Sequence, residues 1–103
     1  MKVFLGADHG GFQLKQQIKR QLEQQGHEVG DFGCHSTDPV DYPDFALLVA
    51  KAVSGVEAAG GTARGIMVDS IGQASAIVAN KLPGVRAVVG WSVYAVESAR
   101  SHN

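Results

Sequence analysis

The sequence has little cysteine, no long hydrophobic run and almost no excess charge, and each absence excludes a class of protein. Cys34 is the only cysteine among 103 residues, which excludes an internal disulfide and a cysteine-based zinc site. Nine basic residues balance ten acidic ones, so an extended basic surface for nucleic acid is not expected. No apolar run approaches the roughly 18 residues of a membrane span, and the first ends at Asp8, too early for a signal peptide. We expect a cytoplasmic protein that binds neither nucleic acid nor a membrane.

The residues that are present favour a packed globular domain. The hydrophobic fraction is 45% and the charged fraction is 18%, values that suit a hydrophobic core and argue against disorder. Thirteen glycines stand singly or in pairs between apolar segments, which indicates tight turns rather than a low-complexity linker. The length suits a single domain over residues 1–103.

Short apolar segments alternate with segments of helical periodicity. In the first helical segment Leu14, Ile18 and Leu22 recur every four residues, and Gly26 is a good helix stop. Asp44 is a candidate cap for the second helix, which Gly55, Gly60 and Gly61 would end. This order predicts an α/β fold, a parallel sheet with helices on both faces. The expected strands are residues 2–7, 27–32, 65–68 and 85–90, and the last two helices are 73–81 and 92–101.

Ligands of such folds bind beyond the carboxyl ends of the strands, which directs attention to two turns. The first is Asp8 to Gly11, after the first strand. Asp8 could bind substrate hydroxyls or simply cap the following helix. His9 could donate to an anion such as a phosphate at the helix N-terminus, or be a solvated turn residue.

The second turn is Asp69 to Ser75, after the third strand. Asp69 could act as a general base if burial raised its pKa from about 3.9, and the small residues after it would let a ligand approach the backbone. The alternative is again a helix cap. The turn has neither the phosphate-binding spacing of a Walker loop nor the dinucleotide fingerprint. Cys34, His27 and His35 do not form a convincing metal site either.

Five stretches, in order along the chain, resemble one family: ribose-5-phosphate isomerase B and the two galactose-6-phosphate isomerase subunits. The resemblance implies a Rossmann-like three-layer α/β/α sandwich with a parallel sheet. It also implies an enzyme of carbohydrate metabolism that interconverts aldose and ketose phosphates by moving a proton through an enediol. Neither a metal nor an organic cofactor is implied, and the family works as dimers or tetramers with active sites between subunits. The stretches are GADHGGFQLKQQI (6–18), VGDFG (29–33), VDYPDFA (40–46), ANKLPGVRA (79–87) and ARSHN (99–103).

The resemblance also assigns roles to residues. Asp8 and His9 would contact the sugar phosphate, His102 falls on the proton donor for ring opening, and Asn103 falls on a substrate-binding asparagine. Asp69 stands where the base stands. The remaining substrate-binding candidates come from the same loop: Ser70, Ile71, Gly72, Gln73 and Ala74.

This loop departs from the usual pattern, Cys-Gly-Thr-Gly-x-Gly, in which the cysteine is the base. Asp69 replaces the cysteine, Ile71 replaces the threonine, and Ser75 stands where some members carry a glutamate base. The loop is similar to that of the galactose-6-phosphate isomerase A subunit, which acts with a subunit that keeps the cysteine. Two interpretations follow: an isomerase with Asp69 as base that acts on a sugar phosphate other than ribose 5-phosphate, or a non-catalytic sugar-phosphate-binding subunit that needs a paired, cysteine-bearing subunit.

The resemblance further implies a longer chain, because family members usually continue for roughly 40–50 residues more than these 103. Those residues supply a fifth strand, a C-terminal helix that packs on the partner subunit, and arginines that bind phosphate. Without them we expect weak phosphate binding and a partly unprotected sheet edge.

Overall fold

The structure is a computed structural model, and it describes residues 1–33, 42–70 and 72–102. Three strands form a parallel sheet in the order β2-β1-β3, with β1 in the centre. A short 3₁₀ helix, η1, connects β1 to α1. The elements are β1 (Lys2–Ala7), η1 (His9–Gly11), α1 (Phe12–Gln24), β2 (Glu28–Asp31), α2 (Tyr42–Ala58), β3 (Ala63–Val68), α3 (Ala74–Ala79) and α4 (Val93–His102).

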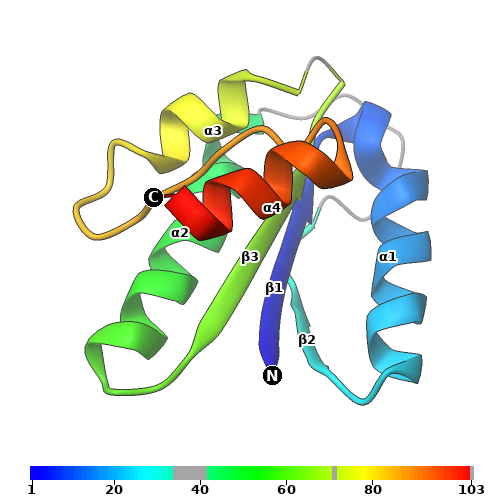
Figure 1. Cartoon of the computed structure of the whole chain (residues 1–103). Coiled ribbons are helices and arrows are strands. Elements are labelled where there is room, and N and C mark those ends of the chain that lie inside the picture. Colours follow the sequence, from blue (N-terminus) through cyan, green and yellow to red (C-terminus); the bar gives the residue numbers. More distant parts are fainter. Residues whose placement is uncertain (34–41, 71, 103) are drawn as a thin grey trace.

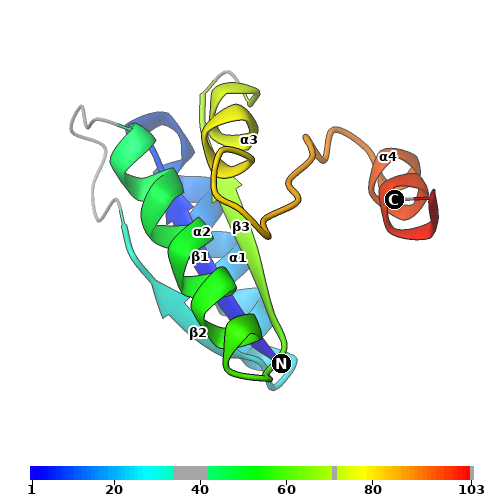
Figure 2. The same ribbon diagram turned by 90° about the vertical axis from the view of Figure 1, so that its left-hand side faces the viewer.

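Helices cover both faces of the sheet. In Figures 1 and 2, α1 lies on one face, and α2, with α3 beside it, lies on the opposite face. The chain therefore crosses from one face to the other as it passes from the β2 edge to the β3 edge, which is how a doubly wound sheet is built. The predicted three-layer α/β/α sandwich with a parallel sheet is confirmed.

The core lies around the central strand. All residues of β1 after Lys2 are buried, as expected for a strand that is covered on both faces. Phe4 packs in a cluster with Val49 and Ala63, and its ring centroid lies 5.6 Å from that of Phe32. The continuous apolar run at the start of the sequence is thus explained by burial on both sides.

The inward face of α1 differs from the prediction in one position. Leu14 is 51% exposed, whereas its neighbour Lys15 has no exposed surface. The predicted stripe of Leu14, Ile18 and Leu22 is therefore wrong at Leu14, because an acidic partner, Asp31 on β2, draws the lysine inward. The predicted end of this helix is confirmed, since α1 ends at Gln24 and Gly26 has a φ of +88°.

The bounds of α2 also correct the sequence interpretation. The helix begins at Tyr42, so Asp44 lies within its first turn and is not the residue that precedes it. Gly55 lies inside the helix, which continues to Ala58 before Gly60 turns the chain with a φ of +89°. A glycine costs a helix interior only about 1 kcal/mol, which the packing of the apolar α2 face against the sheet outweighs.

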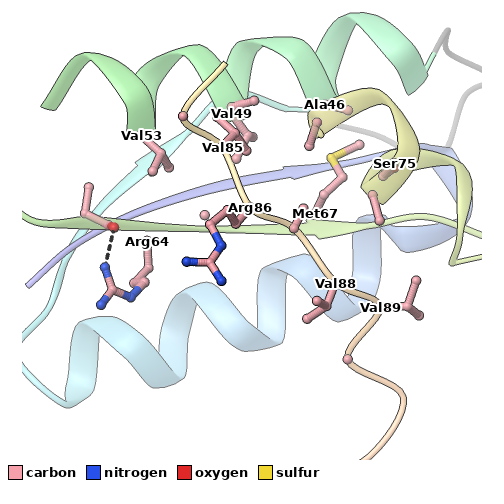
Figure 3. A pocket seen from close by; sticks show the side chains of 18 of the residues that line it. Ala46, Val49, Val53, Arg64, Met67, Ser75, Val85, Arg86, Val88 and Val89 are labelled. Carbon is pink, nitrogen blue, oxygen red and sulfur yellow. Dashed lines mark hydrogen bonds between the residues drawn. The ribbon is translucent and has the colours of Figure 1, made fainter. Parts of the chain in front are cut away.

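The predicted fourth strand, residues 85–90, is wrong. Among the described residues the sheet has three strands, and residues 85–90 run past β3 without pairing with it. The side-chain amide of Asn80 instead holds this segment, donating to the Ala87 carbonyl at 2.8 Å and accepting from the Ala87 N–H at 2.7 Å. A cavity of about 420 Å³ lies between the segment, β3, α2 and α3. Figure 3 shows Val85 of the segment, Val53 of α2 and Met67 of β3 lining it.

The last helix begins as predicted and stands apart from the sheet. The Ser92 hydroxyl accepts the Ala95 N–H at 3.0 Å, which caps the first turn of α4. In the structure, which describes α4 in full, no residue of this helix is buried, and Figure 2 shows it separated from the other helices. Among the described residues, no helix combines the length and the apolar character needed to cross a membrane.

Candidate active site

The two turns singled out from the sequence meet at one edge of the sheet. β1 and β3 are adjacent and parallel, with Ala7 paired to Val68, so the residues that follow each strand emerge side by side. The Asp8 N–H donates to the Val68 carbonyl at 3.1 Å, which extends this contact one residue beyond the strand. The carboxyl edge of the sheet therefore carries both aspartates, Asp8 and Asp69.

Asp8 is the residue that fastens the two turns together. One carboxylate oxygen, Oδ1, accepts the Gly11 N–H at 2.8 Å and so caps η1. The other, Oδ2, accepts the Ser70 N–H at 2.9 Å and the Ser70 hydroxyl at 2.8 Å. The capping interpretation of Asp8 is confirmed, and the side chain is only 6% exposed.

These contacts set the charge state of Asp8. Burial by itself raises the pKa of the Asp8 carboxyl, but the hydrogen bonds from the backbone and hydroxyl of Ser70 and from the backbone of Gly11 outweigh it. The pKa of Asp8 is therefore held below its ordinary value. Asp8 is an anion whose hydrogen bonds join η1 to the turn after β3.

Two glycines allow the turns to approach this closely. A Cβ atom on Gly11 would lie 2.1 Å from the carbonyl oxygen of Val68, and one on Gly10 would lie 2.1 Å from the Ser70 hydroxyl oxygen. The Val68 oxygen is a backbone atom, so the contact of η1 with β3 depends on glycine at position 11, whereas at position 10 the obstacle is the Ser70 side chain, which is hydrogen-bonded to Asp8. Gly10 and Gly11 were predictable as turn residues, but the close packing at Gly11 was not.

The carboxylate of Asp69 is engaged by its own loop. Oδ1 accepts the N–H of Gly72, and Oδ2 accepts both the N–H of Ser75, at 3.1 Å, and the Ser75 hydroxyl. A carboxylate offers about four lone-pair sites, and these donors take three of them. Ser75 is itself buried and opens α3, so Asp69 closes the loop in the manner of a helix cap.

The other predicted residues are distributed around this edge. His9 is exposed on η1, and Ser70, Gly72, Gln73 and Ala74 lie in the turn after β3 or at the start of α3. His102 is in the last turn of α4, the helix that stands apart in Figure 2, so this chain alone does not bring it to the two turns. Ile71 and Asn103 lie outside the described residues.

The role of Ser75 as a hydrogen-bond partner of Asp69 is what sequence reasoning missed, although the residue itself ends the turn singled out there. Its hydroxyl and N–H both go to Asp69, and the signal was a serine placed where a helix begins after an acidic residue. Across the described ranges, no group of three histidine, cysteine, aspartate or glutamate side chains is placed to hold a metal ion.

A parallel α/β/α sandwich with polar turns joined at its carboxyl edge is the arrangement of an α/β protein that binds a small molecule at that edge. Residues 3–103 match the family described as Ribose/Galactose Isomerase, and the chain belongs to this family. The resemblance drawn from the sequence is confirmed.

Individual relatives agree with this assignment. The whole chain is 43% identical to ribose-5-phosphate isomerase B of Mycolicibacterium paratuberculosis, over 63% of that protein's length. Nearly all of it is 42% identical to ribose-5-phosphate isomerase B of Escherichia coli K12, over 66% of its length. The solved structure of Clostridium thermocellum ribose-5-phosphate isomerase B superposes with a TM-score of 0.91 at 46% identity, covering the whole chain and 67% of that protein. The chain thus spans somewhat less than two thirds of these curated relatives.

Proposed function

We propose that the chain forms the site of an aldose–ketose isomerase that acts on a phosphorylated sugar by proton transfer through an enediol. Relatives of the family at 42–43% identity are ribose-5-phosphate isomerases B, which supports this reaction class. The structural observation that carries the proposal is the Asp8 bridge. It holds the turns after two adjacent parallel strands in one rigid arrangement, and such an edge is where α/β proteins bind phosphorylated ligands.

In this proposal the two turns divide the work. His9, exposed at the start of the η1–α1 segment, supplies a donor for the phosphate, and Ser70, Gly72, Gln73 and Ala74 present their backbone to the sugar. The main contribution of Asp8 to sugar binding is indirect, because its hydrogen bonds hold Ser70 and η1 in place. Asp69 would remove the proton from carbon through Oδ1, which accepts only the Gly72 N–H among the described contacts.

Ring opening needs a second group, and His102 with Asn103 are our candidates. Because α4 stands apart from the sheet, we propose that these residues act on the site of another copy within a cytoplasmic dimer or tetramer. Residues 1–103 would then form one isomerase-like domain whose site is completed between subunits.

Deuterium exchange tests the reaction. The chain is incubated with aldose phosphates in deuterated water, and uptake at C2 is followed by NMR. We expect exchange that falls by about 10²-fold or more in Asp69→Asn, the usual effect of removing a general base. Glu57→Gln, a carboxylate on α2 remote from the turns, is the matched control and should exchange as the parent chain does. Undiminished exchange in a folded Asp69→Asn variant excludes Asp69 as the base.

A second function is favoured by one observation, the three hydrogen bonds that occupy the Asp69 carboxylate. A carboxylate held this way suits a structural cap, and the chain would then be a sugar-phosphate-binding subunit without its own base. This alternative predicts no exchange by the chain alone and exchange only when a cysteine-bearing homologue is added.

A further inference from the structure

A buried ion pair joins α1 to the end of β2. Lys15 has no exposed surface, and its Nζ donates to both carboxylate oxygens of Asp31, at 2.8 and 2.6 Å. The same Nζ donates to the Gln16 side chain at 3.1 Å and lies 5.4 Å from the centre of the Phe12 ring. The ammonium group is therefore fully enclosed and held by several partners from both elements.

The ion pair is connected to the candidate site through the backbone. Asp31 Oδ1 also accepts the Gly33 N–H at 3.0 Å, and the Gly33 carbonyl accepts the Ala7 N–H at 2.6 Å. Ala7 is the last residue of β1 and directly precedes Asp8. Two hydrogen bonds thus separate the Lys15–Asp31 pair from the residue that fastens the two turns.

The same pair also fixes the other side of the η1–α1 segment. Asp8 holds the start of this segment through Gly11, and Lys15 anchors the following helical turn to β2. His9 lies on η1, close to the first of these anchors. Its backbone position therefore depends on Asp8 before it and on the attachment of α1 behind it.

A buried ion pair is a poor way to gain stability alone. Its desolvation cost offsets much of the attraction, and apolar replacements of similar volume are often neutral or stabilising. An aliphatic residue at position 15 would also satisfy the inward face of α1, which Ile18 continues. What the pair adds is a fixed link between elements, because Asp31 accepts from the Lys15 ammonium on α1 and from the Gly33 N–H at once.

We propose that Lys15 and Asp31 are positioning residues of the sugar-phosphate site: the buried pair, acting through Gly33 and Ala7, sets the geometry of the Asp8–His9 turn. The inference rests on the proposed function. The Lys15 side chain has no exposed surface and that of Asp31 is 9% exposed, so the pair acts by orienting the residues of the site.

The test separates positioning from stability. The double variant Lys15→Met/Asp31→Leu replaces the pair with apolar side chains, Lys15→Arg keeps the charge, and Lys19→Met is the matched control. Lys19 is suitable because its Nζ lies 3.6 Å from the same Asp31 carboxylate but its side chain is 34% exposed. For each protein we would measure the Tm, the amide NMR shifts of Ala7, Asp8 and Gly11, and the Kd for ribose 5-phosphate.

We expect the double variant to remain folded while the three amide signals move and the Kd rises by about tenfold or more, as misplaced binding groups require. Lys19→Met should change none of these, and Lys15→Arg should lie closer to the parent chain than the double variant does. Unmoved amide signals in the folded double variant would overturn the inference. If the parent chain binds neither ribose 5-phosphate nor any other aldose phosphate, the proposed function fails, whereas the amide signals still decide the positioning role. Should the double variant not fold, the isosteric Asp31→Asn gives the same amide comparison.

Discussion

At the scale of single residues, the candidate site is tightly constrained by hydrogen bonds to its two aspartates and by close packing at its glycines. Within the part of the chain that the structure describes, Asp8 and Asp69 each accept three hydrogen bonds, and in both cases a serine contributes its backbone and its hydroxyl together. The two aspartates are thus used first to shape the turns. Whatever chemistry the site performs takes place on a framework that the same carboxylates hold rigid.

Gly11 is the position at which a single substitution would most disturb this framework. Gly11→Ala places a methyl group 2.1 Å from the Val68 carbonyl oxygen, a backbone atom that cannot rotate away. We expect a loss of roughly 1–3 kcal/mol in the free energy of unfolding, the usual cost of overpacking. Urea unfolding followed by far-UV circular dichroism measures it.

Gly55→Ala is the matched control for Gly11→Ala. Gly55 lies inside α2, and a Cβ atom there would meet nothing within 4 Å. Alanine should stabilise the helix at this position by roughly 0.4–1 kcal/mol. Equal effects of the two substitutions would show that the η1 turn does not contact β3 as closely as described.

At the scale of elements, the ion pair between α1 and β2 makes the stability of the fold depend on pH. Burial alone raises the pKa of Asp31, but the hydrogen bonds from Lys15 and Gly33 and the charges of Lys15 and Lys19 outweigh it and lower the pKa below its ordinary value. A lowered pKa stabilises the fold above the unfolded value of about 3.9, and this contribution is lost as the pH falls through the folded pKa. Asp31→Asn should therefore be less stable at pH 7 and lose less stability as the pH falls below about 3.9.

Denaturant unfolding at a series of pH values checks this expectation. Asp8, whose pKa is also lowered, remains in the variant, so some acid sensitivity should persist. Parallel curves for the parent chain and Asp31→Asn would mean that the Lys15–Asp31 pair does not form in solution.

A separate prediction concerns residues 85–90, because the side chain of Asn80 holds Ala87 in the middle of this segment. Asn80→Ala removes both side-chain hydrogen bonds to Ala87, at an expected cost of about 1 kcal/mol in the free energy of unfolding. The Ala87 amide should then exchange with solvent faster. Asn80→Asp keeps an acceptor for the Ala87 N–H but turns a carboxylate oxygen toward the Ala87 carbonyl, so its protection should lie between those of the parent chain and Asn80→Ala. Retained protection in Asn80→Ala would contradict these hydrogen bonds.

The strands also show how much of the fold could be predicted from the sequence. β1 and β3 were predictable because a continuous apolar run favours a strand in a parallel sheet, and β2 because residues 27–32 lie between the helix stop at Gly26 and Gly33. The alternation of strands and helices indicated the fold class. Residues 85–90 have the same local character, but pairing depends on a neighbouring edge, and here Asn80 takes the backbone groups of Ala87. A local pattern indicates an extended segment and does not determine its partner.

The same limit applies to the site. The positions of Asp8 and Asp69 at the carboxyl edge followed from the order of elements. Their hydrogen bonds did not, because Ser70 reaches Asp8 across 62 positions of sequence. Lys15 was missed as an inward residue for a similar reason, since its partner Asp31 lies 16 positions away on another element.

At the scale of the whole molecule, stability is divided unequally between the sheet and α4. The five residues of β1 after Lys2 are buried, whereas Trp91, Val93 and Tyr94, in and just before α4, are 75–76% exposed. A ten-residue helix is shorter than the ~12–15 residues that an isolated helix needs for even marginal stability in water. The free energy that keeps α4 folded must come from what it packs against, and within the described part of one chain it packs against little.

Amide hydrogen exchange should therefore separate the two regions in dilute solution. We expect the amides of β1 to exchange only through global unfolding, and those of α4 to exchange with little protection. Because Trp91 is the only tryptophan, its fluorescence should report an exposed indole and should not follow the unfolding of the sheet. If α4 is covered by a second copy, the protection of its amides and the Trp91 emission should both change as the protein concentration rises. The protection of the β1 amides should stay the same. Full protection of α4 at concentrations where sedimentation shows a monomer would mean that the helix packs on its own sheet, and that His102 reaches the turns of its own chain.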